Sequence, residues 1–182
     1  MSIAVVTGAS GGIGAEIAKR LAQDGFSVAL IYNRNAEKAQ KTADEITLSG
    51  GSAKTYKCDV RDSSEITSAI EAIERDFGEI SVLVNNAGIS MRALFVDLEL
   101  DVIRRLMDVN FWGTVYCTKF ALPYILKTKG SLVGIISVAG FLGLPGRTGY
   151  SASKFAVRGF LNTLRVENLK KGLHVLVAAP GF

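Results

Sequence analysis

The sequence predicts an α/β fold with a doubly wound, mostly parallel sheet and helices on both faces. Short apolar runs alternate along the chain with longer amphipathic stretches. Most of the apolar runs are rich in Val and Ile and lack a regular polar alternation. Strands buried on both faces of a parallel sheet have this composition. Their alternation with helices implies right-handed βαβ units.

Six apolar runs are the expected strands. In chain order they are Ile3–Thr7, Ser27–Tyr32, Ala53–Lys57, Ile80–Asn85, Leu132–Ser137 and Val175–Ala179. Six stretches have helical periodicity: Gly12–Asp24, Ala36–Leu48, Ser64–Phe77, Leu98–Asn110, Trp112–Lys127 and Tyr150–Lys171. Asp62 stands where the third helix should begin. Because ligands of such sheets bind beyond the carboxyl ends of the strands, we expect the functional residues just after each strand.

Composition favours a single globular domain over residues 1–182. The chain has 182 residues, with 48% hydrophobic and 21% charged side chains, a balance typical of a folded domain. The net charge is +4, and the basic residues are scattered in runs of at most two. A nucleic-acid-binding protein usually gathers such residues on one face, so we expect no nucleic-acid partner.

Cysteine usage and apolar segments predict the cellular setting. Cys58 and Cys117 lie far apart and form no CxxC motif, which argues against a disulfide framework and a metal site. The amino-terminal residues lack the basic region and the long apolar region of a signal peptide. The longest uncharged stretch, Ser131–Gly146, is too short to span a bilayer and contains Gly and Pro. These features predict a cytoplasmic protein without a membrane anchor.

A glycine-rich loop follows the first expected strand and precedes the first helix. It reads Thr7-Gly8-Ala9-Ser10-Gly11-Gly12-Ile13-Gly14. Glycine lets the backbone approach a pyrophosphate closely, and a helix N-terminus attracts negative charge. A glycine cluster alone is equally consistent with a simple turn. The strand before it and the helix after it favour a dinucleotide site.

The spacing of this loop resembles that of a known enzyme family. Thr-Gly-x-x-x-Gly-x-Gly, formed by Thr7, Gly8, Gly12 and Gly14, is similar to the cofactor loop of the short-chain dehydrogenase/reductase family, which has a Rossmann fold. The match extends from Thr7 to Gly181. The resemblance implies a nicotinamide cofactor held by six loop residues. They are Gly8, Ser10, Gly11, Gly12, Ile13 and Gly14.

The end of the second expected strand bears on the choice of cofactor. About 20 residues past such a loop, an acidic side chain usually holds the ribose hydroxyl of NAD. Here the strand ends Tyr32-Asn33-Arg34, with no acid. Arg34 can pair with a 2′-phosphate, although a solvated surface arginine is the simpler reading. We therefore expect NADP(H) to be preferred, with NAD(H) as the alternative, and Asn33 and Arg34 beside the ribose.

The third and fourth expected strands end in two more motifs of the family. The resemblance implies that Asp59 and Val60 border the adenine, whereas the residues alone make Asp59 equally a turn or cap residue. After the fourth strand comes Asn-Asn-Ala-Gly, whose composition also suits a tight turn. In the family this motif stabilises the central sheet near the adenosine ribose. The resemblance therefore adds Asn86, Ala87 and Gly88 to the cofactor site.

Tyr150 and Lys154 are spaced so that they share one helix face. A free tyrosine, with a pKa of about 10, is a poor base at neutral pH. A nearby cation favours the phenolate, and such a phenol can protonate an alkoxide or deprotonate an alcohol. The spacing Tyr-x-x-x-Lys alone is common and says little.

The position of Tyr150 and Lys154 relative to Ser137 supports a catalytic role for the pair. Ser137, at the end of the fifth expected strand, can hydrogen-bond a substrate carbonyl. With Tyr150 and Lys154 it matches the family's Ser…Tyr-x-x-x-Lys arrangement in order and spacing. Asn110 matches the fourth catalytic position, where the asparagine side chain holds a water that links the lysine to solvent. The resemblance implies hydride transfer between NADP(H) and a carbonyl or alcohol substrate, with Tyr150 as general acid or base and Lys154 on the nicotinamide ribose.

The end of the chain bears on the substrate. Pro180 and Gly181 match the family motif near the nicotinamide, and the sequence stops at Phe182. Family members continue, so a C-terminal substrate lid and a last strand are expected to be missing from this stretch. Residues 89–94 and 142–148 are expected to line the pocket, and their apolar character favours a fairly apolar ketone or alcohol. A 3-oxoacyl thioester, a steroid-like ketone and a small diketone remain open.

Two other functions compete with this interpretation. One is a non-catalytic dinucleotide-binding protein, against which the presence of Ser137, Tyr150 and Lys154 argues. The other is an inactive fragment of the family fold, which only the early stop favours. The family usually pairs the helices that correspond to residues 112–127 and 150–171, which implies a homodimer or homotetramer.

Overall fold

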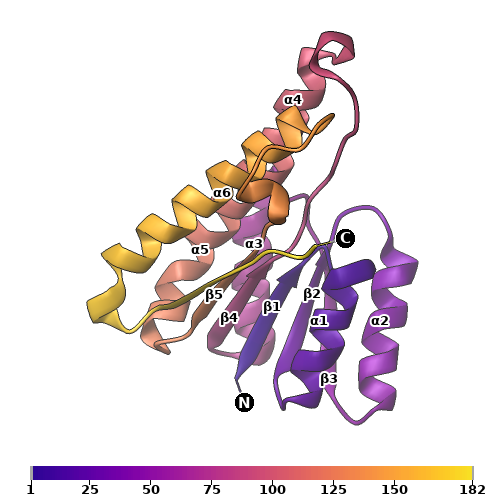
Figure 1. Cartoon of the computed structure of the whole chain (residues 1–182). Helices are drawn as coiled ribbons and strands as arrows, with labels where there is room; N and C mark the ends of the chain where they lie inside the picture. Colours follow the sequence, from indigo (N-terminus) through magenta and orange to yellow (C-terminus); the bar gives the residue numbers. More distant parts are fainter. Residues whose placement is uncertain (1, 182) are drawn as a thin grey trace.

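A six-stranded parallel sheet forms the centre of the protein. The computed structural model describes residues 2–181 (Figure 1). The strands are β1 (Ile3–Thr7), β2 (Ser27–Tyr32), β3 (Ser52–Lys57), β4 (Ile80–Asn85), β5 (Ser131–Ile135) and β6 (His174–Ala178). Their order across the sheet is β3-β2-β1-β4-β5-β6. The winding direction reverses between β1 and β4, which is where sheets of this kind bind ligands.

Two helical layers cover the sheet (Figure 1). The helices are α1 (Gly12–Gln23), α2 (Ala36–Leu48), α3 (Ser63–Phe77), α4 (Leu100–Leu106), α5 (Gly113–Lys127) and α6 (Thr148–Glu167). Helices α1 and α2 bury Ala18 and Ile46 on one face. Helices α3, α5 and α6 bury Ile70, Ile125 and Leu161 on the other. Successive strand side chains point to opposite faces, so each strand contributes to both cores.

Short helical turns complete the chain. Three 3-10 turns span Phe95–Asp97, Val138–Gly140 and Leu169–Lys171, and a π-helical turn spans Met107–Trp112. Asp62 caps α3 as expected, because its carboxylate accepts hydrogen bonds from the backbone N–H groups of Ser64 and Glu65. Among residues 2–181, no helix is both long and apolar enough to cross a membrane.

The predicted doubly wound fold is confirmed, but several boundaries were wrong. Strand β5 ends at Ile135, so Ser137 lies two residues beyond it, in a turn. Strand β3 begins one residue earlier than expected and β6 runs one residue earlier along the chain. Helix α6 begins two residues earlier and ends at Glu167, where a 3-10 turn follows.

The expected helices 98–110 and 112–127 form one continuous helical run from Leu100 to Lys127. Helices α4 and α5 are joined through the π-helical turn Met107–Trp112, and Trp112 keeps right-handed helical angles. A π turn accommodates one extra residue without leaving the helix. The predicted break at Phe111 is therefore wrong, because this residue lies within the π-helical turn.

Candidate functional site

Two adjoining cavities lie at the carboxyl edge of the sheet. The larger, of about 520 Å³, lies against the residues that follow β1, β2, β3 and β4. The smaller, of about 250 Å³, lies against the residues that follow β5 and β6 and the start of α6. Gly88, Ile89 and Ser90 line both. The segment after β4 therefore forms a common wall between the two cavities.

Most of the expected site residues line one of these cavities. Those on the larger are Gly8, Ser10, Asn33, Arg34, Asp59, Val60, Ala87 and Gly88. Those on the smaller are Ile13, Asn86, Gly88, Ser137, Tyr150, Lys154, Pro180 and Gly181. Four expected residues line neither. Gly11 and Gly12 are exposed at the start of α1, whereas Gly14 and Asn110 are buried.

Thr7 and Asn86 hold the glycine loop against the end of β4. The Thr7 hydroxyl accepts hydrogen bonds from the backbone N–H groups of Asn86 and Ala87, both at 3.0 Å, and donates to the Val84 carbonyl at 3.3 Å. The Asn86 amide donates to the carbonyls of Thr7 and Gly8. These bonds satisfy backbone groups that strand pairing leaves free, so the two turns are held as one unit.

Gly14 allows α1 to pack tightly on this unit. A Cβ atom at this position would meet the Asn86 amide nitrogen and the Gly8 carbonyl oxygen at less than any normal contact distance. We expect Gly14→Ala to lower the free energy of unfolding by about 2 kcal/mol, measured by urea denaturation, because over-packing outweighs the gain in helix propensity.

Gly159 provides the matched control for this substitution. It lies inside α6, and an added Cβ would have no neighbour within 4 Å. Gly159→Ala should raise the free energy of unfolding by about 1 kcal/mol, since alanine favours the helix. Equal effects of the two substitutions would contradict the packing that the structure gives to Gly14.

Lys154 lies buried in the wall of the smaller cavity. Its side chain is 5% exposed, and Nζ donates a hydrogen bond to the Ile135 carbonyl at 2.9 Å. Nζ lies 5.7 Å from the centre of the Tyr150 ring. Burial lowers the pKa of Lys154 to about 8, because the charged form is poorly solvated there. A cation is thus held beside the phenol.

Arg147 places a second cation near Tyr150 and holds the segment that contains Ser90 and Met91. Its guanidinium carbon lies 5.9 Å from the centre of the Tyr150 ring. The same group donates to the Ser90 hydroxyl and, at 2.7 Å, to the Met91 carbonyl. The Ala93 N–H donates to the Gly146 carbonyl at 3.0 Å. Segments 89–94 and 142–148 are thereby tied together. Both were expected to line the pocket, but of these residues only Ile89 and Ser90 line either cavity.

Ser137 keeps a hydrogen-bond donor for a ligand. Its hydroxyl oxygen accepts from the Ala139 N–H at 3.2 Å, which caps the turn Val138–Gly140. A serine hydroxyl has one proton to donate, and this bond does not use it. Ser137 therefore presents an O–H group to the same cavity as Tyr150 and Lys154.

Asn110 clamps the wall between the cavities. Its amide oxygen accepts from the Ile89 N–H at 2.8 Å, and its amide nitrogen donates to the Ile89 carbonyl and the Ser153 hydroxyl. Both amide protons are therefore used within the protein. A Cβ built on Gly88 would lie 3.2 Å from Asn110 Oδ1 and 3.5 Å from Lys154 Nζ, so these groups face the same small space.

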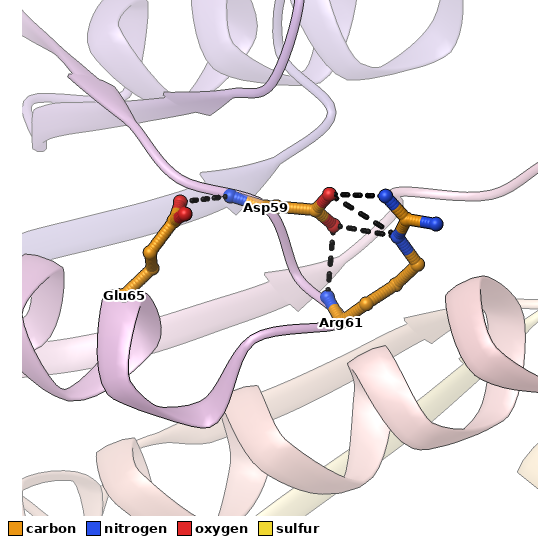
Figure 2. A network of polar contacts seen from close by, with 3 residues as sticks. All are labelled: Asp59, Arg61 and Glu65. Carbon is orange, nitrogen blue, oxygen red and sulfur yellow. Dashed lines mark hydrogen bonds and ion pairs between the residues drawn. The ribbon is translucent and has the colours of Figure 1, made fainter.

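Asp59 takes part in a local polar network at the larger cavity (Figure 2). Its carboxylate pairs with the Arg61 side chain, and its backbone N–H donates to Glu65 at 2.8 Å. Hydrogen bonds from Arg61 hold the pKa of Asp59 down at about 2, so the group is ionised at all ordinary pH values. Asp59 therefore orders a turn, one of the roles that the sequence left open, and it also lines the larger cavity.

Cys58 is a buried thiol that lines the larger cavity. Burial raises the pKa of the Cys58 thiol to about 12, so this cavity-lining group stays protonated and a weak nucleophile near neutral pH. Within residues 2–181, no three His, Cys, Asp or Glu side chains gather closely enough to hold a metal ion.

Sequence reasoning missed several polar residues of the site, among them Arg61, Arg105 and Ser153. Arg61 and Arg105 line the larger cavity, and Ser153 links Asn110 to the Tyr150 carbonyl. Arg61 follows the expected Asp-Val pair directly, so its proximity was a usable signal. No sequence signal pointed to Arg105 or Ser153, because their positions depend on how α4 and α6 pack.

Comparisons with known proteins define the family. A family model described as short chain dehydrogenase matches residues 2–182. A 3-oxoacyl-[acyl-carrier-protein] reductase of Synechocystis sp. is 38% identical over 181 residues, which cover 99% of this chain and 73% of the relative. The human dehydrogenase/reductase SDR family member 7 is 39% identical over 170 residues, 89% of this chain and 49% of the relative. The chain belongs to the short-chain dehydrogenase family.

Solved structures agree with this assignment. A dehydrogenase/reductase from Sinorhizobium meliloti 1021 has a TM-score of 0.95 at 36% identity, covering 99% of this chain and 71% of its own. An alcohol dehydrogenase from Thermococcus sibiricus, complexed with 5-hydroxy-NADP, has a TM-score of 0.94 at 28% identity. The match covers 100% of this chain and 76% of the alcohol dehydrogenase. The predicted family and its oxidoreductase class are confirmed.

Proposed function

We propose that this chain transfers a hydride between NADP(H) and a carbonyl or alcohol substrate. One observation carries the proposal: Ser137, Tyr150 and Lys154 line a single cavity, which shares a wall with the cavity of the glycine loop. The adjoining cavities offer room for the two ends of an extended dinucleotide and for a small substrate beside one of them.

The residues of the larger cavity fit a phosphorylated dinucleotide. Gly8 and Ser10 line it next to the N-terminal end of α1, where backbone N–H groups and the helix dipole favour phosphate. Asn33 and Arg34 follow β2 and line the same cavity. Neither is acidic, and a guanidinium suits a 2′-phosphate.

Three residues of the smaller cavity each have a separate role in the reaction of a carbonyl group. A nicotinamide, when bound, supplies or accepts the hydride. The Ser137 hydroxyl orients the substrate oxygen by donating a hydrogen bond. The Tyr150 hydroxyl gives that oxygen its proton in reduction and takes it back in oxidation. Lys154 contributes a positive charge beside the Tyr150 ring, 5.7 Å from its centre, close to where the proton is transferred.

Thermal unfolding with NADPH and with NADH at equal concentration tests the cofactor. A ligand that binds only the folded chain raises the unfolding midpoint by mass action. At a hundredfold excess over Kd, we expect a rise of roughly 5–10 °C with NADPH and a smaller rise with NADH. Arg34→Ser should remove the difference between the cofactors.

Arg20→Ser is the matched control, because Arg20 is an exposed arginine in α1 that pairs with Asp24 and lines neither cavity. It should leave the NADPH preference unchanged. A larger rise with NADH in the unaltered chain would overturn the choice of NADP(H) and leave the dinucleotide site standing. No rise with either cofactor would reject the site itself.

The substrate is proposed to be a fairly apolar ketone or its alcohol. Apolar side chains line much of the smaller cavity, among them Ile13, Ile89 and Ile136. One relative is named a 3-oxoacyl-[acyl-carrier-protein] reductase, which supports an oxo substrate. A panel of ketones of increasing chain length, followed by NADPH absorbance, should show kcat/KM rising with apolar length.

A further inference from the structure

Arg147 carries a positive charge that helix stability does not explain. It is the N-cap residue of α6, and its side chain makes no capping hydrogen bond. The helix dipole disfavours a cation at this end of a helix. Within residues 2–181, Arg147 forms no ion pair with an acidic side chain. Its charge is therefore neither used by the helix nor neutralised by a carboxylate of the described chain.

One edge of the Arg147 guanidinium has no partner in the described part of the chain. An arginine side chain has five N–H groups. Nη1 donates to the Ser90 hydroxyl and to the Met91 carbonyl, which are both neutral acceptors. Nε and Nη2 donate to no group among residues 2–181. These two nitrogens form the side of the guanidinium plane that can bind a carboxylate through two parallel hydrogen bonds.

This guanidinium lies beside the smaller cavity. Its carbon atom is 5.9 Å from the centre of the Tyr150 ring. Ser90, to which it is hydrogen-bonded, and Tyr150 both line that cavity. An anionic group held by Arg147 would therefore lie close to the hydroxyl that is proposed to exchange a proton with the substrate oxygen.

The lining of the smaller cavity favours a negatively charged ligand with an apolar body. Lys154 is the one charged residue among those described that line it, and none of them is acidic. Ile13, Ile89 and Ile136 supply apolar surface. An anionic group would thus meet the cations of Lys154 and Arg147 without an opposing acid. Apolar walls also weaken the screening of such an attraction by water.

We propose that Arg147 determines substrate specificity by binding a carboxylate of the substrate, so that the chain prefers oxo acids to neutral ketones of the same length. The proposal rests on the proposed oxidoreductase function and names the substrate class of that site. The carboxylate is unchanged by the reaction, because the hydride goes to the carbonyl carbon and the Tyr150 proton to the carbonyl oxygen. The apolar chain of an oxo acid preserves the expected dependence on chain length.

The test compares 3-oxohexanoate and 4-oxohexanoate with their methyl esters, by kcat/KM for reduction with NADPH. For at least one of the two pairs, we expect the acid to exceed its ester by about tenfold or more, as for one charge-assisted pair. In Arg147→Met the acid and the ester should agree within about threefold. Arg147→Lys should give an intermediate ratio, because lysine keeps the charge and lacks the planar fork.

The ratio of acid to ester within one variant separates specificity from a structural role. Loss of the hydrogen bonds to Ser90 and Met91 alters the cavity wall for both compounds, whereas loss of the charge affects only the acid. Arg92→Met is the matched control, because Arg92 is an exposed arginine of the same segment that lines neither cavity. An equal loss of the preference in Arg92→Met would indicate general attraction to a basic surface and would overturn the proposal.

Thermal unfolding with NADP⁺ and either compound gives the same comparison without turnover, because the oxidised cofactor cannot reduce a ketone. The acid should raise the midpoint more than its ester does. Reduction of the esters with no preference for the acids would overturn the proposal and leave the proposed function standing. Weaker NADPH binding by Arg147→Met, with the ratio unchanged, would assign Arg147 to the cofactor instead. If no compound were reduced and none raised the midpoint, the proposed function and this proposal would fall together.

Discussion

Tyr150→Phe is expected to abolish turnover while cofactor binding is retained. Phenylalanine preserves the ring that lies 5.7 Å from Lys154 Nζ and 5.9 Å from the Arg147 guanidinium. It removes only the hydroxyl that would exchange a proton with the substrate oxygen. Since general acid–base catalysis contributes about 10²–10⁴-fold to such rates, kcat should fall by at least about a hundredfold.

The measurement is kcat for ketone reduction with NADPH, together with the cofactor-induced shift of the unfolding midpoint. The midpoint shift should match that of the unaltered chain within about 1 °C. Tyr116→Phe is the control, because Tyr116 of α5 stacks on Trp112 and lines neither cavity. A Tyr150→Phe chain that retained a tenth of the original kcat would refute the assignment of Tyr150 as proton donor.

Lys154→Met is expected to inactivate the protein and to stabilise its fold. The pKa of Lys154 in the folded chain is about 8, against an ordinary value of 10.5. A lowering of this size means that burying the charged amine costs about 3 kcal/mol below pH 8. Methionine avoids this cost and fills a similar volume. It leaves the Ile135 carbonyl without its donor, which costs about 1 kcal/mol, so a net gain of about 2 kcal/mol follows.

The pH dependence of that gain follows from the direction of the shift. Between pH 8 and 10.5 the unfolded chain binds the Lys154 proton more strongly than the folded chain does. The stability of the unaltered chain, measured relative to Lys154→Met, therefore rises with pH across this window and is constant below it. Above pH 10.5 both states carry a neutral amine, and the penalty for burying the charge disappears.

Urea unfolding of both chains at pH 7 and at pH 10 provides the measurement. The advantage of Lys154→Met should shrink by about 2 kcal/mol between the two pH values, because most of the shift in pKa is titrated over that range. Lys119→Met, at an exposed position of α5, should show no such trend. A Lys154→Met chain that was less stable than the parent at pH 7 would show that the ammonium group is well compensated in the fold.

The existence of the six strands and the ends of some elements were predictable because they follow from local pattern. Val- and Ile-rich runs buried on both faces defined β1, β2 and β4 to the residue, and the amphipathic period defined α2. The joint between α4 and α5 was not predictable in this way. A π-helical turn changes the period at Met107–Trp112, and a reading based on a constant period cannot follow it.

Within the candidate site, the sequence alone determined those residues whose relation is set by one element. Tyr150 and Lys154 share a helix face through their spacing, and the glycine loop lies between a strand and a helix whatever the rest of the chain does. Helical and extended periodicities are properties of the backbone itself, so such relations survive in any tertiary context.

Only the tertiary structure decided which groups are free and which are already bonded. The Asn110 amide is hydrogen-bonded to Ile89 and Ser153, and the Asp59 carboxylate is hydrogen-bonded to Arg61. Hydrogen bonds and ion pairs act over a few ångströms, so they depend on how turns close and how helices pack on the sheet. Residue type and spacing identify a polar group. The packing then decides which partner that group bonds to, and therefore whether the group is available to a ligand.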